Sequence, residues 1–324
     1  MLDTPSEPRS TRLPVLMLVL ATLFWGMGFA WAKNLGEAFN DAAGVPKGST
    51  LGPTITLATR FAMATLMWLA IFPAARRGWS RGTWWRGLLI GGVLSVSIIA
   101  QHLGLDRASE ATTAFLTNLT VVFIPLLLAI VLLRLPKKQL LAAVPFALAG
   151  IFLLTGAGFG RLSTGETYGV AYGVGCAMGF SVQILLMNWL IPQDSPMRIT
   201  VLMFAVTAIV SGLVAMASPG FWQIDWMRLV TSPSVVVQWA LMVLLVTLVA
   251  FGLMNQFQPQ VDPTRAVIVY LCEPIFAALF AWITERDGAM TRPALLGAGL
   301  ILVANVVAEL RWPKNVPVPP PAIT

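Results

Sequence analysis

Ten runs of mostly apolar residues, each about as long as a membrane span, follow one another along the chain with short polar breaks between them. They cover 13–35, 52–75, 84–105, 109–133, 138–159, 167–191, 197–218, 234–258, 262–284 and 292–311. A helix that crosses a bilayer needs about 20 such residues. Backbone in hydrocarbon must satisfy its hydrogen bonds internally, and these runs are too long for the strands of a barrel. The sequence therefore predicts an all-α integral membrane protein with ten transmembrane helices.

The composition excludes a soluble domain. Of the 324 residues, 57% are hydrophobic and 11% are charged, whereas soluble domains carry about 25% charged residues. The net charge of +7 is better explained by cationic cytoplasmic loops than by a nucleic-acid partner. The first run follows Arg9 and Arg12, and its Ala30-Trp31-Ala32 resembles a signal-peptide cleavage site. Because the run is longer than the roughly 7–15 apolar residues of a signal peptide, we interpret it as a retained first helix.

The distribution of Lys and Arg predicts the orientation. If the N-terminus is cytoplasmic, 13 of the 21 basic residues lie on the cytoplasmic side and 8 lie outside. The first half of the chain carries this bias, through the loops RRGWSR and RLPKK. Cytoplasmic loops of membrane proteins are enriched in these residues. We therefore expect an N-terminal tail at 1–12 and a proline-rich C-terminal tail at 312–324, both cytoplasmic.

The two halves of the chain share a layout that predicts an internal repeat. In each half, a proline-bearing run precedes a short charged link and then a run with a small-residue face. An offset of 149 residues, without a gap, superimposes Pro125 on Pro274, Ala129 on Ala278, Ala149 on Ala298 and Gly150 on Gly299. Matching positions are five spans apart, so the two copies must cross the membrane in opposite directions. Inverted repeats at 13–159 and 167–311, of five helices each, are typical of secondary transporters.

Four stretches of the sequence resemble the EamA-type transporters of the drug/metabolite transporter superfamily. They are FWGMGFAWAK, LGPTITLATRFAMATL, ASEATTAFLTNLTVVFIPLLLAIVL and YLCEPIFAALFAWITE. The resemblance covers residues 13–311, and its most specific part is the EP of the last stretch. It implies two five-helix repeats, export of small organic solutes such as amino acids, and a bacterial inner membrane. The polar loop at 36–50 is longer than the links typical of the family.

The last stretch places a carboxylate, Glu273, inside an apolar run and directly before a proline. Pro274 has no N–H and leaves the carbonyl of Tyr270 without its helical partner. On a helix, Glu273 and Tyr270 share a face with Phe276 and Phe280, which suits a cavity for an ammonium or an aromatic solute. Burial disfavours a charged carboxylate, so Glu273 is a candidate proton carrier. The alternative is that Glu273 only ties two helices together.

Other polar residues within the spans are further candidates for the cavity. His102, the only histidine, either relays protons with Asp106 or lies at the outer interface, and we favour the interface. Arg60 either faces the bundle and binds a carboxylate or extends to the lipid headgroups. Trp25 either lines a cavity or only packs. Amides commonly bridge helices. We expect most of the following to do so and one or two to contact a solute: Gln101, Asn118, Gln183, Asn188, Asn255, Gln256 and Asn305.

The sequence contains no motif for an enzyme, a cofactor or a metal. It has no GxxxxGK[ST] phosphate loop and no HExxH, and Cys176 and Cys272 are far apart. We therefore predict a secondary active transporter, with a small-molecule substrate, the lipid bilayer and protons as its partners, and neither cofactor nor metal. The alternatives are a polytopic membrane enzyme acting on a lipid-linked substrate, or a channel.

Overall fold

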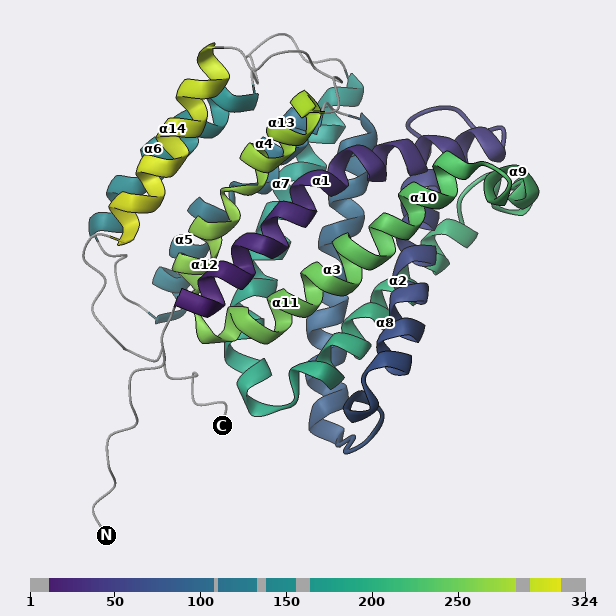
Figure 1. Ribbon diagram of the computed structural model, residues 1–324, viewed down its shortest axis with the longest axis horizontal. Helices are drawn as coiled ribbons and strands as arrows, with labels where there is room; N and C mark the ends of the chain where they lie inside the picture. Colours follow the sequence, from purple (N-terminus) through teal and green to yellow (C-terminus); the bar gives the residue numbers. More distant parts are fainter. Residues whose placement is uncertain (1–11, 108–109, 133–137, 156–163, 284–291, 310–324) are drawn as a thin grey trace.

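The computed structural model describes residues 12–107, 110–132, 138–155, 164–283 and 292–309, and every regular element in these ranges is a helix (Figure 1). The predicted tails at 1–12 and 312–324 lie outside the described residues, except for Arg12. The first half contains α1 (Arg12–Ala42), α2 (Leu51–Ile71), α3 (Arg81–Arg107), α4 (Glu110–Thr117), α5 (Thr120–Leu132) and α6 (Lys138–Thr155). The second half contains α7 (Thr164–Leu190), α8 (Pro196–Met216), α9 (Trp226–Val230), α10 (Pro233–Leu241), the π-helix η4 (Met242–Val249), α11 (Ala250–Phe257), α12 (Pro263–Tyr270), α13 (Glu273–Ile283) and α14 (Arg292–Glu309).

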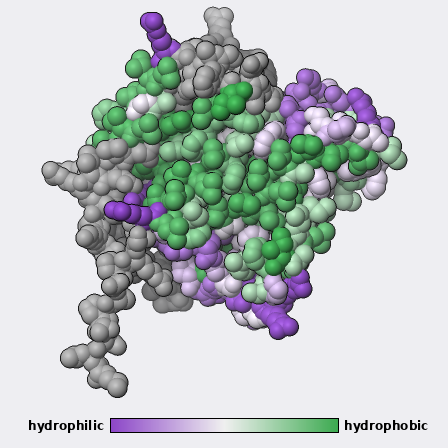
Figure 2. Space-filling model, viewed as in Figure 1, coloured by the Kyte–Doolittle hydropathy of each residue, from purple (hydrophilic) through white to green (hydrophobic). Residues whose placement is uncertain are grey.

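Within these ranges, six segments are long and apolar enough to cross a membrane. They are Arg12–Ala42, Leu51–Ile71, Arg81–Arg107, Thr167–Gln193, Pro196–Met216 and Pro233–Gln260. Large apolar side chains such as Leu66, Val96 and Ile209 are exposed, and Figure 2 shows a broad apolar surface with hydrophilic residues gathered toward its ends. Soluble monomers rarely expose a continuous apolar area of this kind. The chain is therefore a multi-pass, all-helical membrane protein.

A series of aromatic contacts holds the centre of the bundle together. Phe61 of α2 lies edge-on to Phe204 of α8 and to Phe251 of α11, with ring centroids 5.6 and 5.7 Å apart. Phe251 in turn contacts Trp25 of α1 at 5.3 Å, and Trp25 contacts Tyr270 of α12 at 5.5 Å. Edge-to-face pairs contribute about 0.5–1.5 kcal/mol each beyond their buried area. The series fixes one wall of the cavity described below.

The first helix continues beyond its predicted end. Its apolar run stops near residue 35, but α1 extends to Ala42 because Phe39 and Ala42 are buried against residues of α2 and α8, among them Ile55. The part of the polar segment at 36–42 is thus helical, and the true connection starts at Ala43. Arg107 at the end of α3 donates to the carbonyl of Gly48 at 2.7 Å. Only the tertiary contacts explain this extension.

Two of the predicted spans are each divided into two helices. The first contains α4 and α5, separated at 118–119, and the second contains α12 and α13, separated at 271–272. Pro274 is the second residue of α13, where a missing N–H removes no helical bond. Pro125 instead lies inside α5, so the first break is not at this proline. There the side chain of Asn118 donates to the carbonyl of Ala114 at 2.8 Å.

The ungapped offset of 149 residues does not hold at these positions. The two breaks lie 153 residues apart, from 118 to 271. An ideal Cβ on Gly150 of α6 would be 2.8 Å from the carbonyl of Gly297 on α14, whereas Gly299 would meet nothing within 4 Å. The small residue that α14 presents to α6 is therefore Gly297. A fixed offset fails because it takes no account of differences in length between the halves.

A buried carboxylate, Asp194, ties together the ends of three helices. Its side chain is 4% exposed and accepts from Thr83 Oγ1 at 2.6 Å, from Arg86 at 3.2 Å and from Arg198 at 2.8 Å. It also accepts from the N–H of Ser195 at 2.7 Å. Burial by itself would raise the pKa of this carboxyl, but the hydrogen bonds and the charge of Arg198 outweigh it and hold the pKa below its usual value. The group joins the start of α3 to the connection between α7 and α8.

We expect Asp194→Asn to lower stability at neutral pH by about 1 kcal/mol, because charge-assisted bonds are lost but the arginines stay partly hydrated. A carboxyl whose pKa is lower in the folded than in the unfolded chain stabilises the folded state at pH values above its unfolded pKa, which is about 3.9 for Asp. This stabilisation is lost as the pH falls through the pKa of the folded state. The difference in Tm between wild type and variant in detergent should therefore be present at pH 7 and shrink below pH ~4. The exposed Asp41→Asn serves as control. A difference that is the same at both pH values would contradict this account.

Candidate functional site

The helices form a cavity of about 90 Å³, lined by residues of α1, α2, α3, α4, α5, α7, α12, α13 and the η4–α11 segment. A single water needs about 10–15 Å³ of such space, so the cavity holds several waters or a small solute. Eight of the nine polar and aromatic candidates from the sequence line it. They are Trp25, Arg60, Gln101, His102, Asn118, Gln183, Tyr270 and Glu273.

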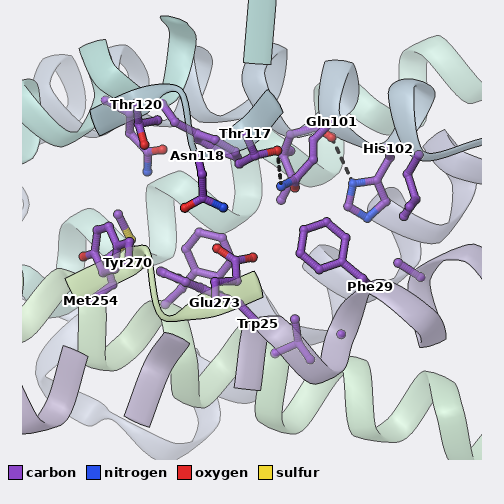
Figure 3. A pocket seen from close by; sticks show the side chains of 18 of the residues that line it. Trp25, Phe29, Gln101, His102, Thr117, Asn118, Thr120, Met254, Tyr270 and Glu273 are labelled. Carbon is purple, nitrogen blue, oxygen red and sulfur yellow. Dashed lines mark hydrogen bonds between the residues drawn. The ribbon is translucent and has the colours of Figure 1, made fainter. Parts of the chain in front are cut away.

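Both helix breaks meet at this cavity. Asn118 lies at the first break, and Tyr270 and Glu273 lie on either side of the second. Figure 3 shows Tyr270 at one end of the cavity and His102 at the other, with Glu273 between them. Helices that break at membrane depth are tolerated where they line a cavity, and their ends are typical of solute sites in transporters. Glu273 is also the first residue of α13, where a negative charge suits the positive end of the helix dipole.

Gly26 determines where Glu273 lies, and the sequence analysis did not single it out as a site residue. A Cβ on Gly26 would be 2.8 Å from the carbonyl oxygen of Glu273 and 2.9 Å from the backbone nitrogen of Ala277. The backbone of α1 therefore packs directly on the first turn of α13. This close approach places Trp25, the neighbour of Gly26, beside the carboxylate (Figure 3). The only signal in the sequence was a glycine following the tryptophan.

Tyr270 is supported by a buried amide pair that the sequence did not reveal as part of the site. Its hydroxyl donates to Gln258 Oε1 at 3.5 Å. Gln258 is fully buried, and its Nε2 donates to the carbonyl of Ile184 at 3.0 Å and to the side chain of Asn188. Asn188 donates to the carbonyl of Val261 at 2.7 Å. These bonds fix the segment between α11 and α12 against α7, and so hold Tyr270 in place.

Arg60 faces the bundle and does not extend to the headgroups. Its residue is 2% exposed, and its guanidinium carbon lies 4.9 Å from the ring centroid of Phe61. Within the described part of the chain, no ion pair neutralises it. It lines the same cavity as His102. A buried cation without a partner is costly, and it leaves the cavity suited to an anionic group.

His102 is a buried wall residue, 6% exposed, and not the interfacial histidine that the sequence favoured. Its Nδ1 lies 3.0 Å from the carbonyl oxygen of Ile98. The His102–Asp106 relay is not present as a hydrogen bond, because Nε2 of His102 and Oδ2 of Asp106 both lack partners among the described residues. The difference has a simple cause: α3 continues to Arg107, so His102 lies more than a turn inside the helix.

Several buried polar atoms in the cavity wall have no hydrogen-bond partner among the described residues. They are Trp25 Nε1, Arg60 Nε, His102 Nε2 and Gln183 Oε1. An unsatisfied buried polar group costs about 1–3 kcal/mol, and folded proteins contain few of them. Four in one cavity, of which two are obligatory donors, indicate a space built for a polar occupant. Among the described residues, no group of three or more potential metal ligands occurs.

The remaining amides differ in what they do. Asn255 lies outside the cavity and donates to Thr200 Oγ1 at 2.8 Å, so it ties α11 to α8. Gln101 lines the cavity and is 3.4 Å from Thr117 Oγ1. Gln183 lines the cavity, and its Nε2 donates to Met187 Sδ at 3.6 Å. Its Oε1 has no hydrogen-bond partner among the described residues. The sequence correctly suggested that some amides bridge helices, but only the packing separates the two kinds.

Comparisons with known proteins also indicate a membrane transporter. Residues 167–308 match the EamA-like transporter family. A protein of Archaeoglobus fulgidus, described as an uncharacterized transporter, is 23% identical over 296 residues, which is 91% of this chain and 85% of that protein. A crystal structure at 19% identity covers 90% of this chain and 96% of its own, with a TM-score of 0.65, and so shares the fold. The resemblance to EamA-like transporters is therefore confirmed over residues 167–308.

Proposed function

We propose that the chain is a secondary active transporter that exports small organic metabolites, amino acids or related solutes, by alternating access. The observation that carries this proposal is the cavity, because a buried cation, Arg60, and a buried carboxylate, Glu273, both line it and the described structure has no ion pair between them. A solute with both an anionic and a cationic group satisfies both residues at once. Trp25 and Tyr270 add aromatic surface that suits an ammonium group.

The packing of the helices supports a ten-span inverted repeat. If α1, α2 and α3 correspond to α7, α8 and the η4–α11 segment, and α4, α5 and α6 to α12, α13 and α14, several of the largest contacts recur between equivalent elements. The packing of α1 on α11 then matches that of α7 on α3, and the packing of α1 on α13 matches that of α7 on α5. In the pairs α2–α8 and α6–α14, each helix packs directly against its equivalent helix in the other half. The cavity lies where the proposed repeats meet, as expected for a transporter that rocks one repeat against the other.

The orientation and the compartment are part of the same proposal. Both termini are placed in the cytoplasm, and the membrane is a bacterial inner membrane. In this orientation, Asp194 with Arg86 and Arg198 lies at the cytoplasmic ends of α3 and α8. The arginine-rich loops are then on the inside, in agreement with the positive-inside rule.

Counterflow in proteoliposomes tests the transport function. Vesicles are loaded with one unlabelled L-amino acid, diluted, and supplied with the same labelled amino acid outside, for each member of a panel. A transporter gives a transient, saturable overshoot of label. A channel equilibrates the label without saturation, and an enzyme on lipid-linked substrates moves none. No overshoot with any member would overturn the proposal for this class of solute.

We expect Glu273→Gln to uncouple transport from the proton gradient. The amide keeps the shape of the side chain but cannot carry the proton that we assign to the carboxylate. Counterflow exchange should persist, whereas net flux should no longer respond to an imposed pH gradient. Flux is measured with and without the gradient, and Glu37→Gln, on the partly exposed Glu37, serves as control. If pH-driven flux survives in folded Glu273→Gln protein, the carboxylate only stabilises the start of α13.

A further inference from the structure

We propose that His102 determines solute specificity by presenting the lone pair of Nε2 to the cavity as a hydrogen-bond acceptor. This inference rests on the proposed function, since it assigns one wall of the same cavity. It gives His102 a role different from proton relay. It also predicts that the solute brings an N–H or O–H group to the end of the cavity near Arg60.

The hydrogen bond at the back of the ring fixes the tautomer. Nδ1 lies 3.0 Å from the carbonyl oxygen of Ile98, and a carbonyl can only accept. Nδ1 must therefore carry a hydrogen. A neutral imidazole has one N–H and one lone pair, so the lone pair is on Nε2. The bond to Ile98, one turn earlier on α3, also fixes the direction in which Nε2 points.

The surroundings of the ring favour the neutral form. Arg60 of α2 lines the same cavity, and a second positive charge there would be repelled. On its own helix, Oδ2 of Asp106 has no hydrogen-bond partner among the described residues, and the described structure shows no ion pair between His102 and either Asp106 or Glu273 of α13. No acceptor among the described residues would receive a hydrogen on Nε2.

The position of the ring makes the lone pair available to a solute. Nε2 is buried without a partner in the described chain, and the residue lines the cavity together with Phe29 and Arg60. The opposite side of the ring is held by α3, so the free nitrogen has only the cavity to face (Figure 3). A site that binds a donor discriminates against analogues that lack it, because its own polar atom then stays unsatisfied. The acceptor therefore selects for a donor beside the anionic group that Arg60 binds.

A first experiment does not depend on transport. His102 is the only histidine, so its carbethoxylation by diethyl pyrocarbonate can be followed by mass spectrometry as a single site. We expect a rate that changes by less than about twofold between pH 7.5 and 5.5, while N-acetylhistidine in the same sample, with its ordinary pKa of about 6.5, slows by about tenfold. A rate at His102 that falls in parallel with the free compound, or no reaction at all, would overturn the inference.

A second experiment uses two variants of the same residue. Asn keeps a donor for the carbonyl of Ile98 but has nothing at the position of Nε2, whereas Gln places an amide oxygen near that position. For an amino acid that shows counterflow with the wild type, we expect His102→Asn to raise KM by about 3- to 10-fold with kcat little changed, the value of one neutral hydrogen bond. His102→Gln should restore part of the loss.

The two variants also separate specificity from folding. Equal KM in both variants and the wild type would overturn the acceptor role, and so would equal loss of kcat in both, which indicates a structural role. If no amino acid shows counterflow, the proposed function fails, and the reaction of His102 with diethyl pyrocarbonate still decides whether Nε2 offers a free lone pair.

Discussion

Gly26→Ala should abolish solute exchange while the protein still inserts and folds. The added methyl group would lie 2.8 Å from the carbonyl oxygen of Glu273 and 2.8 Å from Phe276 Cβ. The first of these is backbone in the first turn of α13, so relief requires that α1 and α13 move apart and that Glu273 leave its place. Overpacking of this kind costs about 1–3 kcal/mol, which lowers Tm but does not unfold the chain.

Counterflow rates and Tm in detergent measure the two consequences of Gly26→Ala. Gly92→Ala is the matched control, because a Cβ at Gly92 of α3 meets nothing within 4 Å. Replacing an unconstrained helical glycine by alanine stabilises by about 0.5–1 kcal/mol, so this control should exchange normally with an equal or higher Tm. If Gly26→Ala exchanges solute at the same rate as the wild type, the cavity does not depend on the contact between α1 and α13.

Arg60→Met should make the empty protein more stable and remove its affinity for the solute. The guanidinium is buried and has no ion pair in the described part of the chain, so its cation–π contact with Phe61 offsets only part of the cost of desolvation. Replacing buried charges by apolar side chains of similar size commonly stabilises by about 1–4 kcal/mol. Loss of a charge-assisted bond to a carboxylate, about 1.5–3 kcal/mol, corresponds to about 10- to 100-fold weaker binding.

The shift of Tm with added amino acid separates these two effects of Arg60→Met. A ligand that binds the folded state raises Tm in proportion to its saturation, so the wild type should gain Tm with solute and Arg60→Met should not. Arg81→Met, at an exposed position at the start of α3, should match the wild type with and without solute. A lower Tm of solute-free Arg60→Met would mean that the guanidinium stabilises the fold rather than binding a solute.

Much of the fold follows from local sequence properties. The predicted runs at 167–191 and 197–218 agree closely with α7 and α8, and proline stands at the start of α8, α10 and α12. Both signals are local, because span length and the missing N–H of proline act within one segment. The break at 271–272 also lies beside Pro274, where the sequence predicts one, whereas the end of α1 and the break at 118–119 were not predictable in this way. Phe39 extends α1 only because residues of α2 and α8 cover it.

The candidate site shows the same division between local and tertiary information. The cost of a polar group in hydrocarbon is a property of single residues, so the sequence by itself determined which side chains to suspect, and Arg60, His102 and Glu273 all line the cavity. Only the tertiary structure decided that they share one cavity while Asn255 does not, and that Gly26 holds Glu273 in position. The physical reason is that the orientation of helices and the distances between them depend on side-chain packing. The polarity of a single residue does not determine which residues pack against it.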